Sequence, residues 1–107
     1  MIIEFNSQNF NKEVLESKIP VIADFFASWC GPCKMLGPVI EQLSDEYNGK
    51  ISVGKVDIDA NIDLAQKYEV VSVPTVIFFE NSEIKRVENG FIPKEQLDDI
   101  IKQTFSL

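Results

Sequence analysis

The sequence predicts an α/β domain whose sheet is parallel at first and closes with an antiparallel hairpin. Residues 21–27 form an almost continuous apolar run, as expected of a strand buried on both faces. Segments with a helical spacing of apolar residues alternate with such strands, and two strands follow each other directly near the end of the chain. The resulting order, β-α-β-α-β-α-β-β-α, is typical of this fold class.

The first two expected elements are short. Residues 2–5 predict a strand, and Ser7 follows them as the expected cap of a helix. Pro20 ends this helix before the buried strand begins. One face of the helix is apolar and carries Phe10, Val14 and Leu15.

The longest helical pattern covers residues 33–47. Pro38 lies inside it, and the local rule would end the helix near Gly37, because the residue before a proline disfavours helical geometry. The apolar spacing continues past the proline, which favours a kinked but continuous helix. The apolar positions are Leu36, Val39, Ile40, Leu43 and Tyr47.

Turn residues separate the remaining elements. Asn48-Gly49 predicts one turn, Glu80-Asn81-Ser82 a second, and Gly90 a break in the chain. Around them we expect strands at residues 51–58, 75–79 and 83–88, a short helix at 62–68 and a last helix at 93–105.

Length and charge exclude several classes of function. With 107 residues, 45% of them hydrophobic, we expect a single domain over residues 1–107. A net charge of −7 favours solubility and argues against binding to nucleic acid. The chain opens without a secretory signal, and its apolar runs are too short to cross a bilayer. We therefore expect a cytoplasmic monomer that makes no membrane contact.

The sequence contains two cysteines and no histidine, which limits the possible chemistry. Without histidine there is no Ser-His or Cys-His nucleophile pair and no histidine-based metal site. Two cysteines are too few for the disulfide framework of a small secreted domain. We expect no metal bound by a single chain.

Cys30 and Cys33 lie three residues apart at an expected strand-to-helix junction. The first N–H groups of a helix lack partners and carry partial positive charge, so they would stabilise a Cys30 thiolate and lower its pKa. Cys33 follows one turn later on the same face, within bonding reach. Pro32 suits the first turn, where its missing N–H is no loss.

This arrangement predicts thiol–disulfide exchange. The Cys30 thiolate would attack a disulfide in a substrate protein, and Cys33 would then resolve the mixed disulfide. The other interpretations are a zinc site shared by two chains, two unrelated buried cysteines, and a permanent structural disulfide. The Gly-Pro pair between the cysteines and the tryptophan before them argue against coincidence, and a cytosolic location argues against a permanent disulfide.

The sequence resembles the thioredoxin family over essentially its whole length. The matching stretches are residues 24–34, with Trp29-Cys30-Gly31-Pro32-Cys33, then Val56-Asp57-Ile58-Asp59, Ser72-Val73-Pro74-Thr75 and Gly90. The resemblance implies the thioredoxin fold, a central mixed five-stranded sheet flanked by four helices. It also implies a protein-disulfide reductase without a bound cofactor. Its redox-active disulfide would receive electrons from NADPH through thioredoxin reductase and pass them to disulfide-containing substrate proteins.

Asp24 and Lys55 gain expected roles from this resemblance. Asp24 is a carboxylate inside an apolar strand, where burial raises the pKa. In thioredoxins the matching aspartate lies behind the second cysteine and assists its proton transfers, and the matching lysine approaches that aspartate. We carry these roles to Asp24 and Lys55. The alternatives are a structural polar residue at Asp24 and a solvated side chain at Lys55.

A docking surface is implied as well. In thioredoxins the bond matching Val73-Pro74 is cis and faces the disulfide, and the backbone before the proline binds an extended substrate segment. The rest of the shallow apolar surface corresponds to Trp29, Gly31, Pro32, Ile58, Pro74 and Gly90.

The sequence departs from the commonest thioredoxin pattern at Asn89 and Phe91, which flank Gly90. This change touches the docking surface, so the partner reductase and the substrate range stay open. An oxidase or isomerase of the same fold and a non-catalytic binding subunit are the alternative functions.

Overall fold

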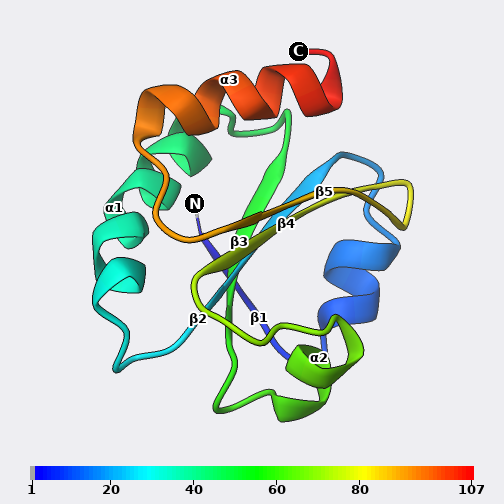
Figure 1. Ribbon diagram of the computed structural model, residues 1–107. Helices are drawn as coiled ribbons and strands as arrows, with labels where there is room; N and C mark the ends of the chain where they lie inside the picture. The colour runs from blue at the N-terminus through cyan, green and yellow to red at the C-terminus, as the bar shows by residue number, and fades with distance from the viewer. Residues whose placement is uncertain (1) are drawn as a thin grey trace.

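The computed structural model describes residues 2–107, and five strands in this part of the chain form one mixed sheet (Figure 1). They are β1 (Ile3–Phe5), β2 (Val21–Phe26), β3 (Ser52–Asp57), β4 (Thr75–Glu80) and β5 (Glu83–Asn89), arranged in the order β1-β3-β2-β4-β5. β3 pairs in parallel with β1 and β2, whereas β4 is antiparallel to both β2 and β5. The predicted parallel start and antiparallel hairpin are confirmed.

Helical segments cover both faces of the sheet. Among residues 2–107, α1 (Gly31–Glu46) and α3 (Lys94–Phe105) pack on one face, and η1 (Asn11–Leu15) and α2 (Ile62–Lys67) on the other (Figure 1). η1 is a π-helical turn, in which the Glu16 N–H donates to the Asn11 carbonyl at 2.8 Å. The expected five-stranded mixed sheet with four flanking helices is confirmed, with this wider turn as the first helix.

The central strand β2 is apolar throughout because a hydrophobic core lies on each side of it. Ile22 belongs to the core beneath α1 and α3, while Val21 and Ala23 belong to the core beneath η1 and α2. Successive side chains of a strand point to opposite faces, so a central strand needs apolar residues at nearly every position. The strand expected at residues 21–27 is therefore confirmed except for its last residue.

Ser7 does not cap a helix, contrary to the expectation from sequence. Asn6 caps the following turn instead, since its side-chain oxygen accepts hydrogen bonds from two backbone N–H groups of that turn at 2.9 Å. The Ser7 N–H instead donates to the Asn61 side chain at 2.9 Å, and its hydroxyl donates to Asp63 of α2. Ser7 thus joins the start of the chain to a helix more than 50 residues away.

α1 continues through Pro38, as the apolar periodicity predicted. It begins at Gly31, two residues before the expected start, and Cys30 is its N-cap. The Asn81-Ser82 turn is confirmed, with positive φ at both residues (53° and 69°), whereas Glu80 is the last residue of β4. The expectation that Pro20 ends the first helix was wrong, because η1 already ends at Leu15. The boundaries of the remaining elements shift by one residue at most. Within the described chain, no helix is both long and apolar enough to cross a membrane.

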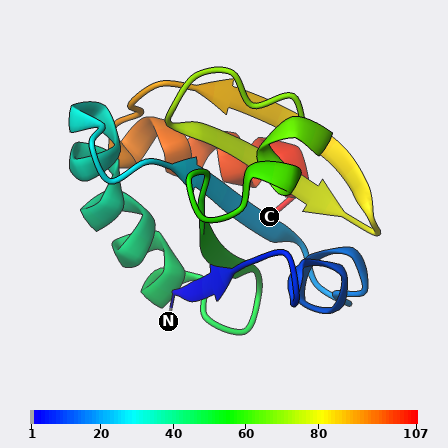
Figure 2. The same cartoon turned by 90° about the horizontal axis from the view of Figure 1, so that it is seen from below.

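Three connections meet at one end of the molecule (Figure 2). They are the loop from β2 into α1, the loop from β3 into α2, and the segment between α2 and β4. Side chains and backbone from all three line a common groove, which contains Cys30. This end of the fold therefore holds Cys30 together with part of the predicted docking surface.

Candidate active site

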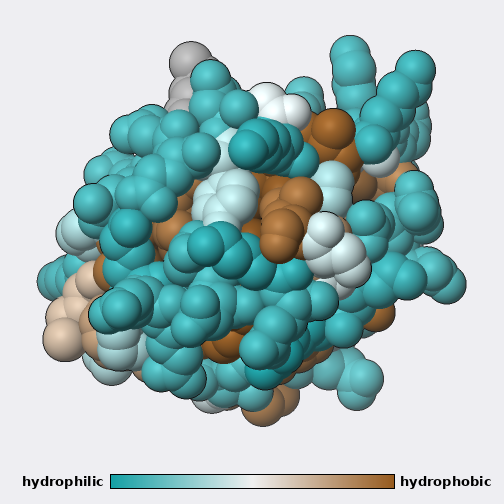
Figure 3. Space-filling model, turned by 90° about the horizontal axis from the view of Figure 1, so that it is seen from above, coloured by the Kyte–Doolittle hydropathy of each residue, from teal (hydrophilic) through white to brown (hydrophobic). Residues whose placement is uncertain are grey.

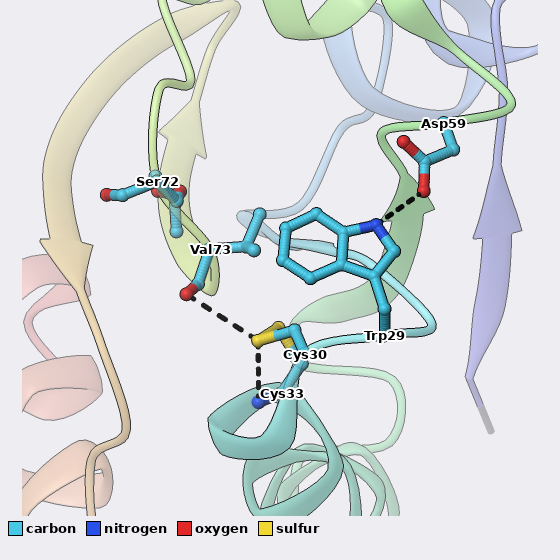
Figure 4. Close-up of a disulfide and its surroundings, with 7 residues drawn as sticks. Trp29, Cys30, Cys33, Asp59, Ser72 and Val73 are labelled. Atoms are coloured by element: carbon cyan, nitrogen blue, oxygen red, sulfur yellow. Dashed lines mark hydrogen bonds between the residues drawn. A yellow bond between two sulfur atoms is a disulfide. The ribbon is translucent and has the colours of Figure 1, made fainter.

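Cys30 and Cys33 form a disulfide at the start of α1, with their Cα atoms 5.3 Å apart. Cys30 has extended backbone geometry (φ −93°, ψ 117°), and the helix begins at the next residue. The Cys33 N–H donates to the Cys30 Sγ at 3.2 Å (Figure 4). This amide of the first turn therefore points at the sulfur that the sequence predicts to be the attacking thiolate.

Both cysteines are almost fully buried, with 5% of Cys30 and 4% of Cys33 exposed, but only Cys30 lies in the wall of the surface groove. The groove has a volume of about 560 Å³, and Cys30 lies in its wall together with Trp29 and the Val73 backbone segment. Cys33 is not part of that wall and packs against Ala27 inside the protein. An incoming disulfide can therefore reach Cys30 from the groove, with Cys33 behind it.

The carbonyl of Val73 lies 3.6 Å from the Cys30 Sγ (Figure 4). In the disulfide the sulfur has no proton to donate, so this is a close contact in the oxidised protein. In the dithiol form a Cys30 S–H can donate to the same oxygen. The Val73-Pro74 peptide bond is cis, as the resemblance implied.

Trp29 covers one side of the groove and is 69% exposed. Its indole N–H donates to the Asp59 carboxylate at 3.0 Å, and the other end of the ring faces the Val73 side chain (Figure 4). Asp59 was not singled out as a site residue from the sequence. It lies within the matching stretch Val56-Asp57-Ile58-Asp59, but nothing in that pattern indicates a bond to an indole.

The predicted docking residues divide into two groups. Those in the groove wall are Trp29, Gly31, Pro32, Ile58 and Val73. Pro74 is buried and Gly90 lies outside the wall, where its N–H donates to the Pro74 carbonyl at 2.8 Å. Gly90 has a φ of +88°, a left-handed conformation that glycine adopts without strain. Gly90 therefore holds the segment around Pro74 through this hydrogen bond.

Sequence reasoning missed three residues of the groove wall, Val70, Val71 and Ser72. They belong to the segment between α2 and β4. The one available signal was the pair of valines in a loop, because loops seldom expose adjacent apolar residues without a binding role.

Asp24 is fully buried in β2, and within residues 2–107 neither of its carboxylate oxygens has a hydrogen-bond partner. Burial raises its pKa from 3.8 to about 7, and the positive charge of Lys55 opposes this shift. Asp24 lies on the same face of β2 as Phe26, two residues on, and Phe26 packs against the cluster that contains Cys30 and Cys33. Its raised pKa was predicted from the sequence and is confirmed.

Lys55 lies directly opposite Asp24 in the parallel pairing of β2 with β3. Its ammonium group stands 4.6 Å from the centre of the Phe26 ring, a cation–π distance. It also lies beside Gly37 of α1, where an added Cβ would be 3.7 Å from Nζ. The structure therefore places Lys55 close to Asp24 and against the helix that carries the cysteines.

No group of three or more cysteine, aspartate or glutamate side chains in the described residues could hold an ion. The redox-active element of the site is the Cys30–Cys33 pair itself.

Comparison with known proteins agrees with the geometry. The family model "Thioredoxin" matches residues 1–103. "Thioredoxin" of Buchnera aphidicola (subsp. Acyrthosiphon pisum) is 40% identical over 98% of this chain and 97% of its own length. "Thioredoxin" of Rickettsia felis is 46% identical over 90% and 91%. "Thioredoxin M-type, chloroplastic" of Spinacia oleracea is 45% identical over 96% of this chain, which spans 57% of that relative.

The matched region contains the whole sheet, the groove and the cysteine pair at the start of α1. The chain thus belongs to the thioredoxin family and is a dithiol–disulfide oxidoreductase that acts through Cys30 and Cys33.

Proposed function

We propose that this protein reduces disulfide bonds in other proteins, with Cys30 as the nucleophile and Cys33 as the resolving cysteine. The observation that carries the proposal is the position of the two cysteines, since Cys30 lies in the groove wall and Cys33 does not. The N–H of Cys33 at 3.2 Å from the Cys30 Sγ supports the negative charge on that sulfur.

The reaction proceeds in two exchanges. The Cys30 thiolate attacks one sulfur of the substrate disulfide, forms a mixed disulfide, and releases the other substrate sulfur as a thiolate. Cys33 then loses its proton and attacks the Cys30 Sγ, which releases the second substrate sulfur. The substrate gains two electrons, and Cys30 and Cys33 end as a disulfide.

Asp24 acts as the acceptor for the Cys33 proton. A carboxyl group with a pKa of about 7 exchanges protons readily near neutral pH, whereas an ordinary aspartate is too weak a base. The support for this role is its burial on the face of β2 that leads to Phe26 and the cysteines. Lys55 tunes it, since its charge favours the ionised carboxylate.

The substrate segment docks in an extended form beside Val73. The backbone at Val73 lies next to the Cys30 Sγ, so a segment that pairs with this backbone brings its own cysteine to the nucleophile. Trp29, Gly31, Pro32 and Ile58 supply the apolar wall around it. Pro74 and Gly90 hold the Val73 backbone in place through the 2.8 Å hydrogen bond between them.

An external reductant must convert the Cys30–Cys33 disulfide back to the dithiol, and we assign this role to a thioredoxin reductase that takes electrons from NADPH. We also propose that the chain works as a cytoplasmic monomer over its single domain of residues 1–107. The small number of cysteines favours a reducing compartment. The spinach relative is named as chloroplastic, so fractionation of cells that express this protein is the direct test of its compartment.

The test is a trapping experiment with matched variants. Cys33→Ser should accumulate a stable mixed disulfide with a model protein substrate, and Cys30→Ser should form none, because the attacking sulfur is then missing. Reduction of the same substrate should proceed with dithiothreitol and also with NADPH plus a thioredoxin reductase. An adduct in the Cys30→Ser protein but none in Cys33→Ser would reverse the order of attack. An oxidising reduction potential, typical of an isomerase, would overturn the reductase direction.

A further inference from the structure

We propose that Asn89 is a positioning residue for substrate docking, because its side-chain amide holds Thr75 and, through Thr75, the carbonyl of Ser72 in the groove wall. Asn89 is exposed at the end of β5, and the sequence identified it only as a departure from the commonest thioredoxin pattern. The inference rests on the proposed function, because the backbone that Asn89 positions is the one that pairs with the substrate.

Asn89 and Thr75 lie opposite each other in the pairing of β4 with β5. Asn89 is the last residue of β5 and Thr75 is the first residue of β4, and the antiparallel register pairs them directly. Opposite residues of such a pair have their side chains on the same face, with Cβ atoms about 5 Å apart. The Asn89 Oδ1 consequently lies 3.0 Å from the Thr75 Oγ1.

The hydroxyl group of Thr75 has one proton and two close neighbours. Its oxygen lies 2.7 Å from the Ser72 carbonyl oxygen, which can only accept, and 3.0 Å from the Asn89 side chain. The shorter contact takes the proton, so the longer one is a hydrogen bond only when Asn89 donates it. A half turn of the amide group brings its Nδ2 to the place of Oδ1. The proton count thus gives a chain of two bonds, from Asn89 to Thr75 and from Thr75 to Ser72.

The burial of Thr75 favours this direction of the two bonds. Thr75 is 4% exposed, so its hydroxyl group has little access to water and depends on these two neighbours for its hydrogen bonds. With Asn89 as the donor, the hydroxyl group donates one bond and accepts another. With Asn89 as the acceptor, Thr75 would give up its shorter bond to Ser72.

The carbonyl groups on both sides of Val73 are held from the end of β5. The chain of bonds through Thr75 holds the carbonyl before Val73, and the Gly90 N–H donates to the carbonyl after it, that of Pro74, at 2.8 Å. The Val73 carbonyl itself lies 3.6 Å from the Cys30 Sγ (Figure 4). The end of β5 therefore sets the position of the docking backbone relative to the nucleophile.

The face of the molecule around α3 offers a substrate little apolar surface. It is mostly hydrophilic, with hydrophobic residues only in small patches (Figure 3). Binding surfaces for proteins usually have larger apolar patches. A substrate in the groove therefore depends on its backbone bonds at Val73, and a displacement of this segment should reduce its affinity.

The first test compares substrate affinity with turnover, with insulin as the protein substrate. Asn89→Ala removes the donor, and we expect KM to rise roughly fivefold, as for the loss of one neutral hydrogen bond, while kcat changes by no more than about twofold. Asn89→Asp keeps the shape of the side chain but accepts instead of donating, so it should raise KM at least as much. Val87→Asp is the matched control, because it adds the same charge on the same face of β5 and should leave KM at the parent value.

A double-mutant cycle tests whether Asn89 acts through Thr75. After Thr75→Val the Asn89 amide has no hydroxyl group to hold, so the addition of Asn89→Ala should raise KM no further. Additive effects of the two substitutions would overturn the inference, because Asn89 would then act on the substrate by another route.

The direction of the bond has its own signature in NMR spectra. One of the two Nδ2 protons of Asn89 should exchange slowly with solvent, like that of Asn61, whose Nδ2 donates to the Asp57 carbonyl at 3.0 Å. Thr75→Val should abolish this protection. Rapid exchange of both Asn89 protons in the parent protein would overturn the direction of the bond and the inference with it.

Failure of the proposed function and failure of this inference are distinguishable. A parent protein that does not reduce insulin with dithiothreitol as the electron source would overturn the proposed function. A parent protein that reduces insulin, together with an Asn89→Ala variant of equal KM, would overturn only the role of Asn89.

Discussion

Asp24 stands opposite Lys55 in the pairing of β2 with β3, yet neither oxygen of its carboxylate has a hydrogen-bond partner among the described residues. An ionised carboxylate in this position loses hydration and regains only the attraction of one ammonium group. The effect of desolvation is larger than the attraction of Lys55, so the pKa of Asp24 rises to about 7. The site thus holds a proton at mildly acidic pH that it releases near neutrality.

Asp24→Asn should stabilise the protein, and the gain should depend on pH. The folded-state pKa of about 7 exceeds the ordinary value of 3.8, so the contribution of Asp24 is present below pH 3.8 and is lost as the pH rises to 7. The stability gained on substitution should therefore be small near pH 4 and on the order of 4 kcal/mol at pH 8. Denaturant unfolding at both pH values measures it, with the exposed Asp99→Asn as control. A gain that did not vary with pH would contradict the assignment.

The same substitution should change the pH dependence of disulfide reduction. If Asp24 accepts the Cys33 proton, Asp24→Asn slows the resolving step and removes the rise in rate around pH 7. Single-turnover rates of disulfide reduction, measured from pH 5 to 9 for both proteins, test this expectation. An unchanged pH profile would rule out the proton-transfer role.

Glu69→Gly should raise the melting temperature. Glu69 follows the C-cap residue Tyr68 of α2 and has a φ of 55°, and the Glu69 and Val70 N–H groups donate to the carbonyls of Gln66 and Ala65 at the end of the helix. Glycine suits this left-handed position, so the substitution should add about 1 kcal/mol to the free energy of unfolding. Glu95→Gly, in the first turn of α3, is the matched control and should lower stability by about 0.5–1 kcal/mol. Calorimetry of both variants gives the comparison, and equal signs would refute the explanation.

Gly54→Ala should destabilise the protein strongly. A Cβ at this position of β3 would lie 2.4 Å from the Phe5 ring and 2.6 Å from the Ile3 carbonyl, and the latter is backbone that cannot turn aside. The strain should cost about 1–3 kcal/mol or more, measured by urea unfolding. Gly31→Ala is the control, since nothing lies within 4 Å of its Cβ. Similar losses for both variants would point to a general effect of removing glycine.

Thr75→Val should weaken docking while leaving the chemistry intact. Thr75 is buried at the start of β4, and its hydroxyl donates to the Ser72 carbonyl at 2.7 Å, next to Val73. Loss of this bond should lower the unfolding free energy by about 1 kcal/mol and raise KM for a protein substrate more than it lowers kcat. Thr104→Val is the contrasting control, because the buried Thr104 hydroxyl has no partner in the described chain and its removal should not destabilise. A KM equal to that of the parent would show that the Ser72 segment holds its position without Thr75.

Local patterns predicted those parts of the fold whose cause is local. The apolar run of β2 follows from its place between two cores, and the periodicity of α1 outweighed Pro38 because a continuous apolar face packs against the sheet. The junction of strand and helix at Cys30 was also predicted, whereas its exact role as the N-cap of α1 came from the structure. The prediction that Ser7 caps a helix was wrong because its hydrogen-bond partners lie at the start of α2. No local pattern in the sequence indicates such distant partners.

The sequence by itself determined the chemistry, since two cysteines three residues apart at a helix start, in a chain without histidine, leave thiol–disulfide exchange as the main possibility. Only the tertiary structure decided which sulfur faces the groove, that Asp59 holds the Trp29 ring, and that Val70 and Val71 line the groove. The physical reason is distance along the chain. Reactivity depends on neighbours within one helical turn, whereas access and docking depend on three loops that the sheet brings to one end of the molecule.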